Sequence, residues 1–353
     1  MTSSKISVAI LDDYQGIAEP IFTHISPKID VKTFPDTINP ITHEDKVALV
    51  KRLQPFTVIS TMRERTAFPR DIIQNLPNLK LLLTTGMKNS AIDMAACAEQ
   101  GIAVVGAKGR GRGAKANPPT SIDSTLEHCW AMILGLARNI ARDDLGVKTG
   151  PWETSHATGL RGKTLGLLGF GNLGARVASV GASAFGMKIL AWSSSLTQQV
   201  ADEKAEAFGC PAGAFIVASS KEELLQRADV LSIHYVLSER SRDILGAKEL
   251  ALLKTSALLI NTSRGPLIDE QALLEVLNQG KIAGTALDVY NVEPLPKDSV
   301  WRSESWGKEG KSQVLLCPHM GYAEKGVMIR WYEDSASNLE LWLEGKDLLT
   351  KLN

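Results

Sequence analysis

The chain has 353 residues, of which 44% are hydrophobic and 22% are charged, and its formal net charge at pH 7 is zero. The length predicts two domains, and the zero net charge argues against nucleic acid or an anionic membrane as a partner. None of the apolar runs approaches the length of a membrane span, and no targeting segment is visible. The scattered cysteines form no C-x-x-C pair, which favours a reduced, cytoplasmic compartment; they are Cys97, Cys129, Cys210 and Cys317.

The N-terminal third alternates between strand and helix patterns. Short apolar runs predict strands over Lys5–Leu11, Thr57–Thr61, Leu79–Thr84 and Ala103–Gly106. Helical spacing of apolar residues covers Asp45–Leu53, Pro69–Leu76 and Ile92–Gln100. This alternation predicts a small domain with its own parallel sheet.

Glycine, proline and basic residues then crowd the segment Lys108–Pro119. Their density predicts a loop, which we place at a domain boundary. We interpret it as a solvated loop rather than an RNA-binding segment, because it is short and the surrounding chain is neutral.

A glycine-rich turn follows the strand pattern Thr164–Leu168 and precedes a helix pattern over Ala175–Gly186 and a second strand pattern over Lys188–Trp192. A strand, a G-x-G-x-x-G turn, a helix and a strand in this order are what a dinucleotide pyrophosphate needs. The backbone N–H groups and the helix N-terminus then face the phosphates. We predict that the turn binds the cofactor through Gly169, Gly171, Asn172, Leu173 and Gly174.

Four more strands are predicted after this βαβ unit, over Val230–Tyr235, Leu258–Thr262, Gly284–Tyr290 and Val314–Cys317, and a helix over Ala323–Leu349. The resulting six strands are the count of a complete doubly wound dinucleotide fold. We predict an α/β protein of two Rossmann-like, doubly wound domains. The dinucleotide-binding domain, 107–320, is inserted into a flavodoxin-like substrate and catalytic domain, 1–106 with 321–353. Two crossings between domains predict an interdomain cleft for a small ligand.

Three of the later strands end in residues that suit carbonyl reduction, namely Arg264, Glu293 and His319. Ligands bind beyond the carboxyl ends of parallel strands, so these side chains are expected to face the cofactor. Arginine holds a carboxylate or carbonyl by charge-assisted hydrogen bonds, and histidine exchanges a proton with the reacting oxygen. A glutamate beside the imidazole orients the ring and favours its protonated form.

A NAD-preferring fold places an acidic residue at the end of its second strand, to bind the ribose 2′-hydroxyl. Here Ser193 and Ser194 stand at that position. Removing the carboxylate removes its repulsion of a 2′-phosphate, so we predict NADP(H) use or dual use, with NADP favoured over NAD.

The remaining histidines predict no metal site. His24, His43 and His156 have no acidic or cysteine neighbour at metal-ligand spacing. His128 lies in an apolar helical stretch and is predicted to be a core residue.

The chain resembles the D-isomer-specific 2-hydroxyacid dehydrogenases over nearly its whole length. The resemblance rests on the glycine turn and on the segments 228–234, 261–265, 286–290, 293–296 and 317–319, in this order. It implies that Arg264, Glu293 and His319 are the catalytic triad, with His319 as general acid and base. It also implies that His234, Thr262 and Asp288 lie near the cofactor, Asp288 beside the nicotinamide carboxamide.

The resemblance extends to the first domain. Residues 83–93 resemble the family loop whose backbone N–H groups hold the substrate carboxylate, which makes Gly86, Met87, Lys88 and Asn89 candidate substrate contacts. The family usually has glycine where Lys88 stands. Arg63 falls where phosphoglycerate dehydrogenases carry a substrate-contacting arginine; the alternative is a surface pair with Glu64.

The sequence therefore predicts an NAD(P)-dependent oxidoreductase that transfers a hydride between the nicotinamide and a small 2-oxo or D-2-hydroxy acid. The resemblance implies a homodimer built on the cofactor domains. Three alternatives stay open: a formate-dehydrogenase-like enzyme, a nucleotide-sensing corepressor on the same fold, and a biosynthetic reductase for an unusual oxo acid. The identity of the substrate does not follow from the sequence.

Overall fold

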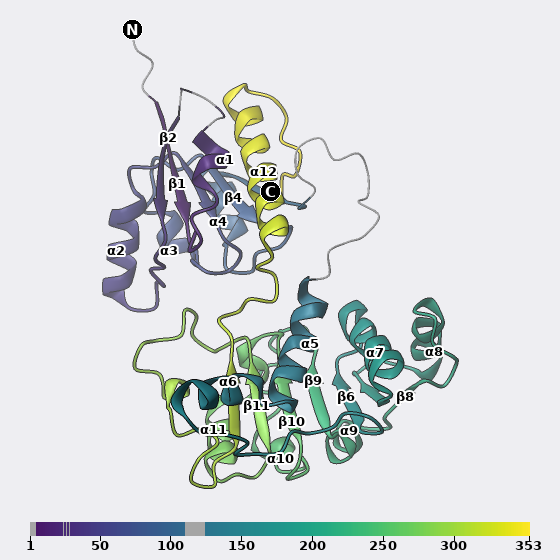
Figure 1. Ribbon diagram of the computed structural model, residues 1–353. Coiled ribbons are helices and arrows are strands. Elements are labelled where there is room, and N and C mark those ends of the chain that lie inside the picture. The colour runs from purple at the N-terminus through teal and green to yellow at the C-terminus, as the bar shows by residue number, and fades with distance from the viewer. Residues whose placement is uncertain (1–4, 24, 26, 28, 110–123) are drawn as a thin grey trace. The chain divides into compact units, whose positions relative to one another are not determined.

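The computed structural model describes residues 5–23, 25, 27, 29–109 and 124–353 (Figure 1). The chain divides into two compact units. The outer unit comprises Met1–Ile122 and Ala323–Asn353, and the central unit comprises Asp123–Tyr322. Most of the predicted loop Lys108–Pro119, and His24, lie outside the described residues.

The outer unit is built on a five-stranded parallel sheet in the order β2-β1-β3-β4-β5. This is the flavodoxin-like order, as predicted. Its strands are β1 (Ile6–Leu11), β2 (Ile29–Phe34), β3 (Val58–Thr61), β4 (Leu81–Thr85) and β5 (Ala103–Ala107). Its helices are α1 (Glu19–Thr23), α2 (His43–Leu53), α3 (Arg70–Ile73), α4 (Met94–Glu99) and α12 (Lys325–Leu343).

Strand β2 and helix α1 were not predicted from the sequence. Strand β2 lies at the sheet edge, pairs only with β1 among the described strands, and alternates Asp30 and Lys32 with apolar residues. A half-exposed edge strand needs no continuous apolar run, so the pattern was missed.

Helix α12 joins the C-terminal end of the chain to the N-terminal sheet (Figure 1). Tyr332 packs edge to face on Phe22 of α1, with ring centroids 6.4 Å apart. The helix ends at Leu343, earlier than the predicted Leu349. The residues that follow are bound in a non-helical path, because Leu349 N donates to Asn338 Oδ1 and Leu352 N donates to Val104 O.

The central unit has a seven-stranded parallel sheet in the order β12-β11-β10-β9-β6-β7-β8. Its strands are β6 (Thr164–Leu168), β7 (Lys188–Trp192), β8 (Phe215–Val217), β9 (Val230–Ile233), β10 (Leu258–Asn261), β11 (Gly284–Leu287) and β12 (Gln313–Leu316). The six predicted strands all form. The prediction that these six complete the sheet was wrong, because the three-residue edge strand β8 adds a seventh.

Helices cover both faces of this sheet (Figure 1). They are α5 (Ser124–Ala137), α7 (Asn172–Phe185), α8 (Gln198–Ala207), α9 (Lys221–Arg227), α10 (Ala247–Leu250) and α11 (Glu270–Asn278). Helix α6 (Ile140–Thr149) buries none of its side chains, and 3-10 turns lie at Gly265–Leu267 and Val300–Arg302. Successive strand residues point to opposite faces, so Ile260 packs in the core under α5 and α7 while Leu259 packs in the core under α9, α10 and α11. No helix among the described residues is long and apolar enough to span a membrane.

Candidate active site

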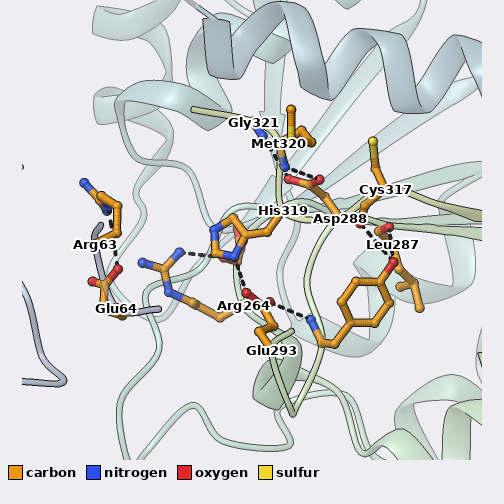
Figure 2. A network of polar contacts seen from close by, with 12 residues as sticks. Arg63, Glu64, Arg264, Leu287, Asp288, Glu293, Cys317, His319, Met320 and Gly321 are labelled. Carbon is orange, nitrogen blue, oxygen red and sulfur yellow. Dashed lines mark hydrogen bonds and ion pairs between the residues drawn. The ribbon is translucent and has the colours of Figure 1, made fainter. Parts of the chain in front are cut away.

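The three predicted catalytic side chains follow three neighbouring strands of the central sheet. Arg264 follows β10, Glu293 follows β11 and His319 follows β12. These strands are adjacent and parallel, so their carboxyl ends lie at one edge of the sheet. The tertiary structure thus brings together three residues that the sequence separates widely (Figure 2).

His319 and Glu293 form a close pair. Nδ1 of His319 lies 2.5 Å from Oε2 of Glu293, and Oε1 of the same carboxylate accepts a hydrogen bond of 2.9 Å from Tyr290 N. The two side chains are 19% and 18% exposed, so the pair is half-buried and still open to a ligand. A carboxylate held at both oxygens fixes the plane of the imidazole.

The guanidinium of Arg264 points toward the His319 ring (Figure 2). Its Nη1 donates to Ser263 O over 2.8 Å, and Asn261 Nδ2 donates to Arg264 O over 2.9 Å. The backbone and the side chain are therefore both anchored at the end of β10. A cation beside an imidazole–carboxylate pair suits the binding of an anionic substrate.

The glycine turn has the close contacts that its pattern predicts. Gly169 has a φ of +95°, and a Cβ there would lie 2.5 Å from His234 O. A Cβ on Gly174 would lie 2.6 Å from Gly169 O. Helix α7 begins directly after Gly171, which supplies no side-chain cap to the first N–H groups, those of Asn172, Leu173 and Gly174. An uncapped 14-residue helix at a tight turn fits a dinucleotide pyrophosphate.

Ser193 and Ser194 follow β7, at the predicted ribose position. The hydroxyl of Tyr235 donates to Ser194 Oγ over 3.1 Å, and its ring stacks on Trp192 with centroids 6.4 Å apart. Thr262, after β10, has its Oγ1 3.1 Å from Cys129 Sγ.

His234 lies against the glycine turn as a neutral group. Its Nε2 lies 2.8 Å from Ser232 Oγ, and burial lowers its pKa to about 4. Its Nδ1 is buried and has no hydrogen-bond partner among the described residues. An unsatisfied buried nitrogen beside the turn also fits a bound cofactor.

Asp288 follows β11 and is 1% exposed. Its Oδ1 accepts from Met320 N over 2.7 Å, and its Oδ2 accepts from Gly321 N over 3.1 Å (Figure 2). Both carboxylate oxygens are thus already bound to the segment that carries His319.

The predicted substrate residues of the outer unit are held by one network. Arg63 N donates to Thr85 Oγ1 over 2.9 Å, and Asn89 Nδ2 donates to Arg63 O over 2.6 Å. The Arg63 guanidinium lies 5.8 Å from the centroid of Trp331, and its Nε lies 3.6 Å from Glu64. Arg63 therefore joins the end of β3 to the 86–89 loop. Its contacts are compatible with both roles that the sequence suggested, a substrate contact and a surface pair with Glu64. Gly86 O accepts from Ala107 N, while Met87 and Lys88 are exposed.

A cluster that sequence reasoning missed joins His128 of α5, Asp288 and Cys317. His128 Nε2 lies 3.0 Å from Asp288 Oδ1. Hydrogen bonds to Asp288 and to Cys317 raise the pKa of His128 to about 9, against the effect of burial. The sequence contains no spacing signal for this cluster, because its members come from three separate elements.

A family model described as the NAD binding domain of D-isomer specific 2-hydroxyacid dehydrogenases matches residues 130–321. The chain belongs to this family. The match covers more than half of the chain, and it confirms the family and the fold class that the sequence motifs predicted.

Several relatives of this 2-hydroxyacid dehydrogenase are similar to it over most of its length. A glyoxylate reductase of Aeropyrum pernix is 31% identical over 336 residues, covering 89% of this chain and 92% of the relative. A hydroxypyruvate reductase of Thermotoga maritima is 34% identical over 281 residues, covering 79% and 82%. The crystal structure of a phosphoglycerate oxidoreductase from Vibrio cholerae matches with a TM-score of 0.81 and 30% identity, covering 96% of this chain and 99% of that one. The family is one of oxidoreductases with an NAD-binding domain, which supports a nicotinamide cofactor.

Proposed function

We propose that this protein reduces a small 2-oxo acid to the D-2-hydroxy acid, or catalyses the reverse reaction, with His319 as general acid and base. The observation that carries the proposal is the 2.5 Å contact between His319 and Glu293, beside Arg264, at the carboxyl edge of the central sheet. Glyoxylate and hydroxypyruvate reductases among the relatives support the substrate class.

In this proposal each side chain has one task. Arg264 binds the carboxylate or carbonyl of the substrate through charge-assisted hydrogen bonds. His319 donates the proton from Nε2 to the alkoxide that develops on the substrate, and takes it back in oxidation. Glu293 accepts from Nδ1 and stabilises the imidazolium. A nicotinamide dinucleotide held at the Gly169–Gly174 turn would supply the hydride. In the outer unit, Arg63 and the 86–89 loop are proposed substrate contacts.

A substrate screen tests the reaction. We expect turnover of one or more of glyoxylate, pyruvate, hydroxypyruvate and phenylpyruvate, with formate oxidation as a separate arm. His319→Gln should lower kcat by about 10²–10⁴-fold, because it removes proton transfer, while dinucleotide affinity stays nearly unchanged. Turnover of formate alone, or of none of these compounds, would contradict the proposal, and so would a fully active His319→Gln variant.

The choice of dinucleotide follows from Ser193 and Ser194. With no carboxylate on these residues to repel a 2′-phosphate, we propose NADP(H) use or dual use. The ratio of kcat/KM for NADPH and NADH measures the preference. A preference for NADH of about a hundredfold or more, equal to some 2.7 kcal/mol, would rule this out.

We also propose a homodimer built on the central unit. Helix α6 buries none of its side chains, and Ile140, Leu145 and Val147 are 60%, 61% and 61% exposed, with Trp152 beyond the helix at 74%. Apolar side chains gathered in this way are typical of a subunit interface. Light scattering at micromolar concentration should give twice the mass of 38.2 kDa. A Leu145→Glu/Val147→Glu variant should be monomeric, and a monomeric wild type would overturn the assignment.

A further inference from the structure

The segment that carries His319 has an unusual backbone. His319 has a φ of +55°, in the left-handed region that residues with a side chain rarely adopt. The conformation needs to be held by the surrounding structure. The next two residues fix this conformation, because the N–H groups of Met320 and Gly321 both donate to Asp288 (Figure 2).

Asp288 can serve as this anchor only if donors or a cation offset the burial of its charge. A carboxylate that is 1% exposed pays a large desolvation cost unless a cation or several donors are bound to it. The imidazole of His128 forms a close pair with this carboxylate, with Nε2 3.0 Å from Asp288 Oδ1, from a helix on one face of the sheet. The side chain of His128 is 15% exposed, so water screens the pair only weakly.

Metal binding is the other chemistry that these side chains suggest. His128, Asp288 and Cys317 each offer one ligand atom, and these atoms lie within 4.8 Å of one another. However, Oδ1 of Asp288 already accepts from Met320 N, and His128 Nε2 lies 3.0 Å from the same oxygen. A metal ion would have to separate this close pair, so the contacts favour an imidazole–carboxylate pair in this place.

We propose that His128 is a positioning residue for the reaction: through Asp288 it holds the Met320–Gly321 backbone, and thereby sets the orientation of the His319 ring. The chain of contacts runs from His128 Nε2 to Asp288, and from Asp288 to the two N–H groups that follow His319. The inference rests on the proposed function of His319.

The test uses variants of the full-length protein. His128→Leu and His128→Asn remove the imidazole that lies against Asp288, the second with a shorter amide that cannot span the distance. His128→Gln places a neutral amide group in reach of the carboxylate. His43→Leu is the matched control, because His43 is an exposed residue at the start of α2 in the outer unit.

Two readouts are measured. The first is kcat and the KM of the dinucleotide on the best substrate of the screen. The second is the nuclear magnetic resonance signal of the Nδ1 proton that His319 shares with Glu293, assigned by its loss in His319→Gln. This signal reports the orientation of the ring whether or not the protein turns over a 2-oxo acid. Failure of the proposed function and failure of the inference are thereby separated.

We expect the Leu and Asn variants to lose about 10- to 100-fold in kcat, with the KM of the dinucleotide changed by less than about twofold. The Nδ1 signal should shift or broaden in both, return in His128→Gln with most of kcat, and stay unchanged in His43→Leu. An unchanged Nδ1 signal in the Leu and Asn variants would overturn the proposal. So would a loss of kcat that His128→Gln does not recover, or a loss confined to the KM of the dinucleotide.

Discussion

The two parallel sheets each bury an aspartate at the carboxyl end of a strand, and they stabilise it in different ways. In the outer unit, Asp12 after β1 is fully buried, and the hydroxyls of Thr37 and Thr66 donate to it over 2.5 and 2.9 Å. In the central unit, Asp288 after β11 is 1% exposed, accepts from two backbone N–H groups and lies 3.0 Å from the His128 imidazole.

The difference appears in the titration of the groups. Burial raises the pKa of Asp12 to about 6, although the two hydroxyls and the charges of Arg65 and Arg52 act in the opposite direction. At the other site the pKa of His128 is raised to about 9, first by its hydrogen bond to Asp288. Hydroxyl donors do not offset the burial of Asp12, whereas the hydrogen bonding and charge around His128 outweigh the burial of its imidazole.

The same substitution should therefore act in opposite directions at the two sites. Asp288→Asn should lower the free energy of unfolding of the central unit by about 4 kcal/mol, because it leaves a buried histidine cation without its anion and turns an amide N–H₂ toward a donor. Hydrogen-exchange mass spectrometry can measure this on central-unit peptides, with outer-unit peptides as the internal control. A loss below about 1 kcal/mol would mean that the carboxylate charge is dispensable there.

The pH dependence of stability should separate the two sites. Both folded-state pKa values lie above their ordinary values, 3.8 for Asp12 and 6.5 for His128, so each contribution to stability is complete at low pH and is lost as the pH rises. The outer unit should lose about 3 kcal/mol as the pH rises from near 4 through 6. The central unit should lose about 3 kcal/mol as the pH rises from 6.5 through 9.

Hydrogen exchange can measure unfolding across this pH range. Comparison with the variants at each site then isolates the contribution of that site to stability. The titratable groups that face His128 are Asp288 and Cys317, so Cys317→Ser is included to remove the thiol. If the central unit of His128→Gln lost as much stability at alkaline pH as the wild type does, the proposed difference between the two sites would be wrong.

The smallest expected effect is a gain. Asp12→Asn should raise the stability of the outer unit at pH 8 by about 2 kcal/mol, because it removes a buried charge while threonine hydroxyls can both donate to and accept from an amide. The full benefit is reduced by the lost attraction to Arg65. Near pH 4, where Asp12 is protonated, the variant and the wild type should differ little. Destabilisation at pH 8 would show that Arg65 outweighs the desolvation of Asp12.

Much of the architecture was predictable because it depends on local pattern. The strands β6 and β7 form at the predicted residues, since fully buried parallel strands are continuous apolar runs. Strands β2 and β8 were not predicted, since edge strands are half exposed and short. The three candidate catalytic residues were accessible to sequence reasoning because each lies in the loop that follows such a run.

The sequence by itself determined that Arg264, Glu293 and His319 follow three parallel strands, and strand direction then brings them to one edge of the sheet. Only the tertiary structure decided how that edge is held. From the sequence, Asp288 was predicted to lie near the cofactor, and His128 was predicted to be a core residue in an apolar helix. Their contact joins residues 128 and 288 across the end of a sheet. No periodicity or motif encodes such a pair, because it depends on where α5 packs against the strands.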